Sequence, residues 1–192
     1  MAIKTFTTGE VLTASDTNNF LANAGLDYIT QASWTTGGVV AVNNCFTSKY
    51  SSYRLVVRNA KHATTAVSVL FRLRVGGVDK GTNGYYYGHY RVPLDGSAGV
   101  QDSGNNVAFI VPGLVAAVSN AGACSMDIYD PQKTAITSVT YQGLWPATTS
   151  ASGPITGGGF LNDSVAYDGF SLTANTGNFT SLTVYVYGYR ES

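Results

Sequence analysis

The sequence is poor in charge. Only 11% of its 192 residues are Asp, Glu, Lys or Arg, against about 25% in typical soluble proteins. The 11 basic and 11 acidic residues cancel, so no domain-wide basic field is available to attract nucleic acid or an anionic membrane. Ordinary surface ion pairs explain the arginines better than a nucleic-acid site does; they are Arg54, Arg58, Arg72 and Arg74. Copies with so little charge repel one another weakly, which suits a protein inside an assembly.

Cysteine and long apolar runs are also scarce. Cys45 and Cys124 are far apart and outside any CxxC pair, which predicts two reduced, buried thiols rather than a zinc site or a disulfide framework. The apolar runs fall far short of the ~20 residues that cross a membrane, and the first residues lack the apolar core of a signal peptide. We therefore expect synthesis in a cytoplasm, no membrane insertion, and neither metal nor other cofactor.

Groups suited to catalysis are few. His62 lies in a loop-like stretch and His89 within a tyrosine cluster, and no zinc-protease, serine-hydrolase or Walker motif accompanies them. The acidic residues near one another in sequence are Asp127 with Asp130 and Asp163 with Asp168. A glycosidase needs two carboxylates placed across one bond, and nothing in the sequence marks such a pair. We expect a protein that is not an enzyme; a glycan-degrading enzyme using Asp127 or Asp168 is the opposing hypothesis.

Residues 1–32 have the pattern of an attachment arm with a short helix. Thr7-Thr8-Gly9 predicts a turn, and Thr13 and Asp16 have the spacing of a helix-capping pair. A helix of about ten residues is not stable alone in water, so we expect it to pack on this chain or on a partner. The apolar side chains that we assign to attachment are Phe6, Leu12, Phe20 and Leu21.

Residues 33–192 change to the period of two that is typical of strands. Apolar and polar residues alternate through 53–58, 67–75, 107–111, 124–128, 139–145, 170–172 and 182–189, with weaker candidates at 38–42, 85–92 and 155–161. The triplet Gly157-Gly158-Gly159 predicts a bulge or a close backbone approach. Roughly eight to ten short strands separated by turn residues, without a long helix, favour a jelly-roll-like antiparallel β-sandwich.

Tyrosine, at 13 residues, gathers in two places. The first cluster, on a weak strand candidate, contains Tyr85, Tyr86, Tyr87 and Tyr90. The second occupies one face of the last strand and contains Tyr185, Tyr187 and Tyr189. Tyrosine combines an apolar ring with a polar tip, so each set suits a subunit interface, a glycan contact, or in part the core and its rim. We prefer self-association for the second set, because three rings on one face are unfavourable in water.

The segment from Lys4 to Leu21 resembles the start of many tailed-bacteriophage virion proteins, which share a pattern close to F-x-x-G-x-x-L-T-A-x-D-x-N-x-x-L. The matching positions are Phe6, Gly9, Leu12, Thr13, Ala14, Asp16, Asn18 and Leu21. Residues 53–57, 167–170 and 184–190 also look like parts of such proteins. Similar sequences are those of minor tail proteins, tail-fibre or receptor-binding subunits, and head decoration proteins.

The resemblance implies a virion structural protein assembled in the host cytoplasm. We expect a tail-associated subunit (minor tail, fibre or receptor-binding) that docks through residues 1–32, presents its sandwich outward and forms a homotrimer. Deleting residues 1–28 should then leave a folded sandwich that no longer joins particles. Two alternatives stay open. One is a capsid decoration or cement protein at the head, and the other is a carbohydrate-binding module that contacts host-surface glycan through Tyr85, Tyr86, Tyr87 and Tyr90.

Overall fold

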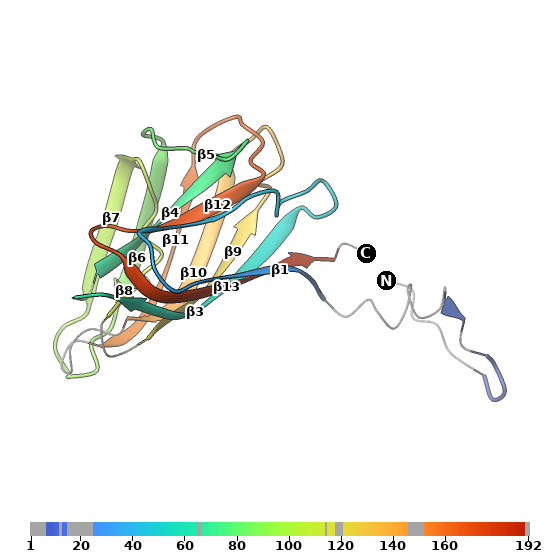
Figure 1. Ribbon diagram of the computed structural model, residues 1–192, viewed down its shortest axis with the longest axis horizontal. Coiled ribbons are helices and arrows are strands. Elements are labelled where there is room, and N and C mark those ends of the chain that lie inside the picture. The colour runs from blue at the N-terminus through green and yellow to red at the C-terminus, as the bar shows by residue number, and fades with distance from the viewer. Residues whose placement is uncertain are drawn as a thin grey trace.

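A computed structural model describes residues 7–11, 13–14, 25–64, 67–113, 115–117, 121–145 and 152–190. Within these ranges the chain forms thirteen strands and no helical element (Figure 1). The expected all-β fold is therefore confirmed, with more strands than the sequence pattern predicts. The predicted helix that follows Thr13 lies outside the described residues.

Eight strands form one antiparallel sheet, which we call the large sheet, in the order β1-β13-β3-β9-β10-β11-β6-β7. Their bounds are β1 Leu26–Trp34, β3 Ser52–His62, β6 Tyr85–Arg91, β7 Val100–Val107, β9 Gly122–Tyr129, β10 Thr137–Trp145, β11 Gly153–Leu161 and β13 Phe179–Tyr189. The small sheet has the order β2-β12-β4-β5, with bounds β2 Val39–Val42, β12 Gly169–Ala174, β4 Val67–Val75 and β5 Val78–Asp79. The short strand β8, Val115–Ala116, pairs with the start of β4.

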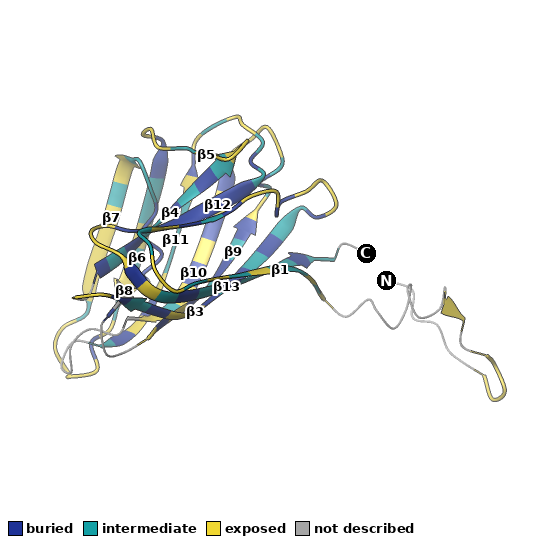
Figure 2. Cartoon of the chain, viewed as in Figure 1, coloured by how far each residue is buried: buried dark blue, intermediate teal, exposed yellow. Residues whose placement is uncertain are grey.

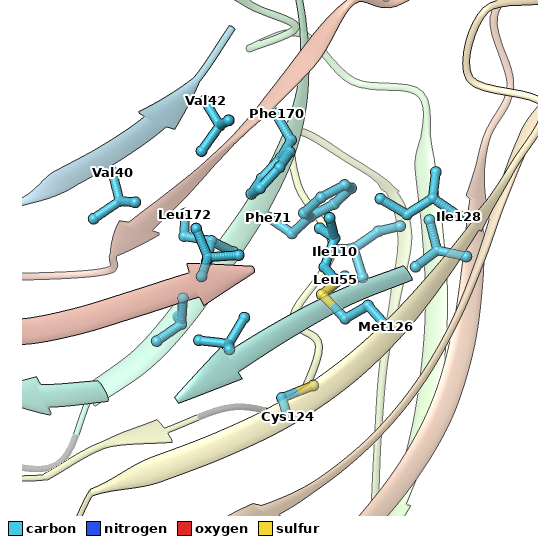
Figure 3. Close-up of a cluster of buried hydrophobic side chains, with 14 of the residues drawn as sticks. Val40, Val42, Leu55, Phe71, Ile110, Cys124, Met126, Ile128, Phe170 and Leu172 are labelled. Atoms are coloured by element: carbon cyan, nitrogen blue, oxygen red, sulfur yellow. The ribbon is translucent and has the colours of Figure 1, made fainter. Parts of the chain in front are cut away.

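The two sheets pack face to face as a β-sandwich, because each presents one apolar face to the other (Figures 1 and 2). In the large sheet, Leu55 on β3 and Met126 on β9 point inward, and in the small sheet Phe71 and Phe170 meet them in one cluster (Figure 3). Burying a side chain of this size stabilises the fold by about 1.5–3 kcal/mol. The alternation predicted for 53–58, 67–73, 124–128 and 182–189 is confirmed by strictly alternating burial along these strands.

Four observed strands, β1, β5, β7 and β8, have no counterpart among the predicted ranges, and one predicted strand is wrong. Residues 26–34 form β1 at the edge of the large sheet, although the sequence pattern assigned most of them to the helical arm. The predicted strand over 107–111 is wrong, since β7 ends at Val107 and the following residues leave the sheet. Ile110 is instead fully buried and forms an isolated β-bridge with Phe71. This residue is therefore apolar because it packs in the core of the sandwich, and not because it belongs to an alternating strand.

The arm and the C-terminal strand meet at one corner of the large sheet. Leu26, the first residue of β1, pairs with Tyr189 at the end of β13, and the Arg190 amide donates to the Gly25 carbonyl at 3.1 Å. Asp27 links the strands at this corner, because its carboxylate accepts hydrogen bonds from the Tyr50 hydroxyl at 2.7 Å and from Arg190 at 2.9 Å. The expected domain boundary after residue 32 falls inside β1.

Candidate functional site

The residues assigned to attachment by the arm, Phe6, Leu12, Phe20 and Leu21, lie outside the described residues. Of the arm, residues 7–11, 13–14 and 25–32 are described, the last of these mostly as part of β1. The predicted turn is confirmed, because the Glu10 amide donates to the Thr7 carbonyl at 3.0 Å and Gly9 has a positive φ of 90°.

The outer face of the large sheet is the surface on which most of the predicted tyrosines lie. Strand register aligns one outward row across all eight strands; its members are Tyr28, Tyr187, Arg54, Asp127, Thr140, Gly158, Gly88 and Ser103. A neighbouring outward row contains Tyr129, Ser138, Phe160 and Tyr86. Directly opposed residues of an antiparallel pair point to the same side, so these rows form one continuous surface.

The half of this face over β13, β3 and β9 is charged, and its polar groups bond to one another. Arg54 binds Asp127 through two hydrogen bonds, of 2.8 and 2.7 Å, and the Tyr189 hydroxyl donates to the same carboxylate at 2.7 Å. Burial alone would raise the pKa of Asp127, but these hydrogen bonds and the charge of Arg54 outweigh it and lower the pKa. Burial and the bond to Asp127 raise the pKa of Tyr189 to about 12.

The predicted tyrosines of the last strand are half-buried and all face outward. Tyr187 meets the exposed Tyr28 of β1 edge-on, with ring centroids 5.9 Å apart, and the Arg54 guanidinium lies 5.6 Å from the centroid of the Tyr189 ring. Their assignment to a subunit interface stays a prediction. Part of each ring is already covered by its neighbours in the same sheet.

The tyrosines of β6 divide between the two faces. Tyr85 is fully buried, and its hydroxyl accepts a hydrogen bond from the Leu73 amide at 2.9 Å, so its ring has no surface to offer a partner. Tyr87 packs against the core and lies next to His89, with ring centroids 6.0 Å apart. Tyr86 and Tyr90 point outward, and Tyr90 remains 44% exposed.

A hollow of about 510 Å³ lies on the other half of the outer face, over β10, β11 and β6. Its residues are Tyr86, Tyr87, Gly88, Gly104, Ser138, Val139, Thr140, Gly158, Gly159 and Phe160. Gly88 and Gly158 are paired in register, and a Cβ added to Gly88 would meet nothing within 4 Å, so the hollow exists where two side chains are missing. Tyr86 and Phe160 stack beside it, with ring centroids 4.9 Å apart and planes 13° apart.

Phe160 is the aromatic residue of this hollow that the sequence analysis did not assign to a site. It follows the predicted triplet Gly157-Gly158-Gly159 and is 37% exposed, an unusual position for a phenylalanine. The triplet has continuous register with both neighbours, so the close backbone approach is confirmed and no bulge occurs there. A Cβ on Gly157 would lie 2.5 Å from the Gly88 carbonyl oxygen and 2.7 Å from Cε2 of Tyr141.

The histidines and carboxylates have structural partners. His62 is buried with Nε2 at 2.8 Å from the Thr176 carbonyl, and burial lowers the pKa of His89, partly opposed by Asp102. Asp163 pairs with Lys80 at 2.5 Å, and Asp168 accepts from the Gly76 amide at 2.8 Å. The expectation that the protein is not an enzyme stays a prediction.

Cys45 and Cys124 are free and buried, as predicted, and burial raises the pKa of each thiol to about 12. Among the residues that the structure describes, no cluster of three His, Cys, Asp or Glu side chains could hold a metal ion. The same part of the chain contains no helix with the length and apolarity needed to cross a bilayer.

Comparisons of the chain with protein-family models, with curated proteins and with solved structures give no match.

Proposed function

We propose that this chain is a structural subunit of a tailed-bacteriophage virion, associated with the tail as a minor tail, fibre or receptor-binding protein. The observation that carries the proposal is a motif-bearing segment of the virion-protein type, residues 4–21, placed directly before an all-β sandwich. The arm would dock on a neighbouring virion protein, and the sandwich would face outward.

The position of the arm supports this orientation. Because β1 starts next to the end of β13, the part of the arm before Leu26 joins the sandwich at one corner of the large sheet. A subunit held at this corner keeps the rest of its outer face and the opposite strand ends accessible. An attachment segment at one end and a rigid body at the other is the arrangement that an appendage requires.

The sandwich itself is, we propose, a jelly roll with an extended sheet. Eight of its strands, in chain order β1, β2, β3, β4, β5, β9, β12 and β13, are divided between the sheets as β1-β13-β3-β9 and β2-β12-β4-β5. Numbered one to eight, they have the orders 1-8-3-6 and 2-7-4-5 of the paired sheets of a jelly roll. On this scheme β6, β7, β10 and β11 are insertions that widen one sheet. Jelly rolls serve widely in viral shells and lectins, so the fold alone does not choose a function.

Homotrimer formation belongs to the same proposal. The low charge of the chain and the half-buried ring faces of Tyr185, Tyr187 and Tyr189 favour contact between copies. Native mass spectrometry of the full chain should give three times the monomer mass of 20.2 kDa. A monomer at every concentration would remove self-association from the proposal.

Immunogold electron microscopy of phage particles from the source lysate, with antibody against the full chain, tests the location. Gold on the tail or its fibres is the expected result. Gold over the head would instead favour capsid decoration, and particle stability with and without the protein would then be compared. Unlabelled particles, with the protein absent from their denatured extracts, would refute a virion role of either kind.

The arm is tested by truncation. The deletion of residues 1–28 suggested by the sequence would remove the first three residues of β1, including Asp27 with its bonds to Tyr50 and Arg190. Deleting residues 1–24 spares them. We expect this truncated chain to keep the cooperative unfolding of the full chain but to be missing from particles; normal incorporation would show that the arm does not dock.

A further inference from the structure

We propose that the hollow over Gly88 and Gly158 binds an uncharged pyranose ring of a glycan. This inference goes beyond a structural role in the virion and holds wherever the subunit sits on a particle. Sugar binding and particle incorporation are therefore tested by separate measurements, and either can fail while the other stands.

The hollow is formed by the absence of side chains rather than by a gap between elements. On the outward row, Ser103, Gly88, Gly158 and Thr140 are consecutive across β7, β6, β11 and β10. Neither central glycine has a positive φ, so the backbone conformation does not demand glycine at either position; a Cβ on Gly88 would meet open space, and one on Gly158 would lie 3.1 Å from the Val139 carbonyl oxygen. Glycine weakens a strand interior, and it often marks a site where a ligand or another backbone comes close.

Stacked aromatic rings border this glycine floor. Tyr86 and Phe160 are neighbours of Gly88 and Gly158 in the adjacent outward row, and they lie nearly parallel to each other. Their stacking orders both rings while leaving Phe160 exposed over more than a third of its surface. The face of an aromatic ring is electron-rich, and the C–H bonds on one side of a pyranose present an apolar, weakly positive surface that packs against it.

The polar groups around the hollow are neutral. None of its ten residues is Asp, Glu, Lys, Arg or His, and the outward face of β10 contributes the hydroxyl-bearing residues Ser138 and Thr140. The nearest charged residues on the same outward row, Arg54 and Asp127, are bonded to each other. A phosphate, a sialic acid or a cationic ligand would find no counter-charge here, whereas sugar hydroxyls exchange hydrogen bonds with hydroxyls and backbone carbonyls.

Size agrees with this chemistry. The volume of about 510 Å³ lies within the ~300–1,000 Å³ of ordinary ligand sites. The hollow is also open to solvent along the sheet, so a ring within a longer chain could enter without its linkages being buried. A single pyranose, or two linked ones, is the occupant that the lining best fits.

The test uses the full chain and saturation-transfer NMR with methyl glycosides of neutral hexoses and N-acetylhexosamines, followed by calorimetry on any that bind. Phe160→Ala and Tyr86→Ala should each weaken binding about tenfold. Gly88→Thr should abolish it while leaving the protein at least as stable, because threonine suits an exposed strand position. Tyr28→Ala is the matched control: it removes an exposed tyrosine of the same face on β1, five strand spacings or roughly 24 Å from β11.

Three results would overturn the proposal. One is the absence of binding by every neutral glycoside up to about 10 mM. Another is binding that survives both Phe160→Ala and Gly88→Thr, since the ligand would then lie elsewhere. The third is tighter binding of glucuronic or sialic acid glycosides than of neutral ones, because the lining contains no positively charged side chain to pair with their carboxylate.

Discussion

The two halves of the large sheet share a backbone and a core yet present very different outer faces. Over β13, β3 and β9, Arg54, Asp127 and Tyr189 bond to one another. Over β10, β11 and β6, glycines leave the backbone bare beside the stacked rings of Tyr86 and Phe160. We call these the charged half and the bare half. Side chains that form hydrogen bonds with one another stabilise the sheet, whereas positions without a side chain leave space for a ligand.

The difference coincides with the proposed jelly-roll order. The charged half belongs to the eight strands of that order, and the bare half consists of the strands inserted into it. An inserted pair of hairpins can lose side chains on its outer face at little cost to the central sandwich. On the proposal that the hollow is a binding site, the site lies on strands added to a common fold rather than on the fold itself.

Gly157 on β11 and Gly88 on β6 give the sharpest contrast, and Gly157 gives the largest effect on stability that we expect. A Cβ on Gly157 would press on the Gly88 carbonyl and the Tyr141 ring, so Gly157→Ala should lower the free energy of unfolding by about 1–3 kcal/mol. Gly88→Ala on the neighbouring strand β6, where Gly88 pairs with Gly158, places its methyl group in open space and should raise the free energy of unfolding by about 0.5–1 kcal/mol. Urea denaturation of both variants measures this. Equal effects of the two substitutions would mean that the bare half is not built around missing side chains.

The charged half should depend on its ion pair. Asp127→Asn removes the charge from a carboxylate that is 18% exposed and binds Arg54 twice. We expect a loss of about 1–2 kcal/mol, discounted because the Arg54 side chain is 38% exposed. Asp102→Asn on the edge strand β7 is the matched control, since that side chain is 55% exposed and 3.7 Å from His89, and it should change stability by under about 0.5 kcal/mol.

Two aromatic pairs extend the comparison to smaller energies. A double-mutant cycle on Tyr86 and Phe160, both replaced by leucine, should give a coupling of about 0.5–1 kcal/mol because the rings stack. The same cycle on Tyr28 and Tyr187 should give less, since Tyr28 is 60% exposed and the rings meet edge-on 5.9 Å apart. A larger coupling in the second pair would reverse the expected order and assign the ordered aromatic surface to the charged half.

The sequence predicts the inner face of the sandwich better than its outer face. Alternation alone identifies Leu55, Val57, Met126 and Val186 as core residues, and all four are buried. In a strand that covers a core, every second side chain is buried. The sequence therefore alternates between apolar and polar residues, and this alternation is visible without knowing which strand pairs with it. The strand missed at 26–34 shows the limit of this rule, because an edge strand with mixed exposure carries a weak period.

The hollow could be predicted only in part, because it is a product of register. Tyr86, Gly88, Gly158, Phe160 and Thr140 come from three strands, and their adjacency depends on how β6, β10 and β11 align. The sequence marks the tyrosine cluster and the glycine triplet separately. Neither segment by itself indicates that Gly88 pairs with Gly158. Without that pairing, nothing in the sequence identifies Phe160 as part of a surface site.

The smallest effect that we expect is a pH dependence confined to the charged half. The folded-state pKa of Asp127 is lowered, so its stabilising contribution is complete above the ordinary aspartate value of about 3.9 and is lost as the pH falls through the lowered folded value. The difference in the free energy of unfolding between the wild type and Asp127→Asn should therefore be constant from about pH 5 to 8 and shrink below about pH 3.5.

The bare half has no group that titrates in the neutral range among its lining residues, so glycoside affinity should stay constant from about pH 5 to 8. Urea titrations of both proteins and calorimetry across this range measure the two responses. A difference in the free energy of unfolding that persists unchanged at the lowest pH would show that the charge of Asp127 contributes nothing, and a glycoside affinity that follows the pH would place an ionising group in a hollow that we consider neutral.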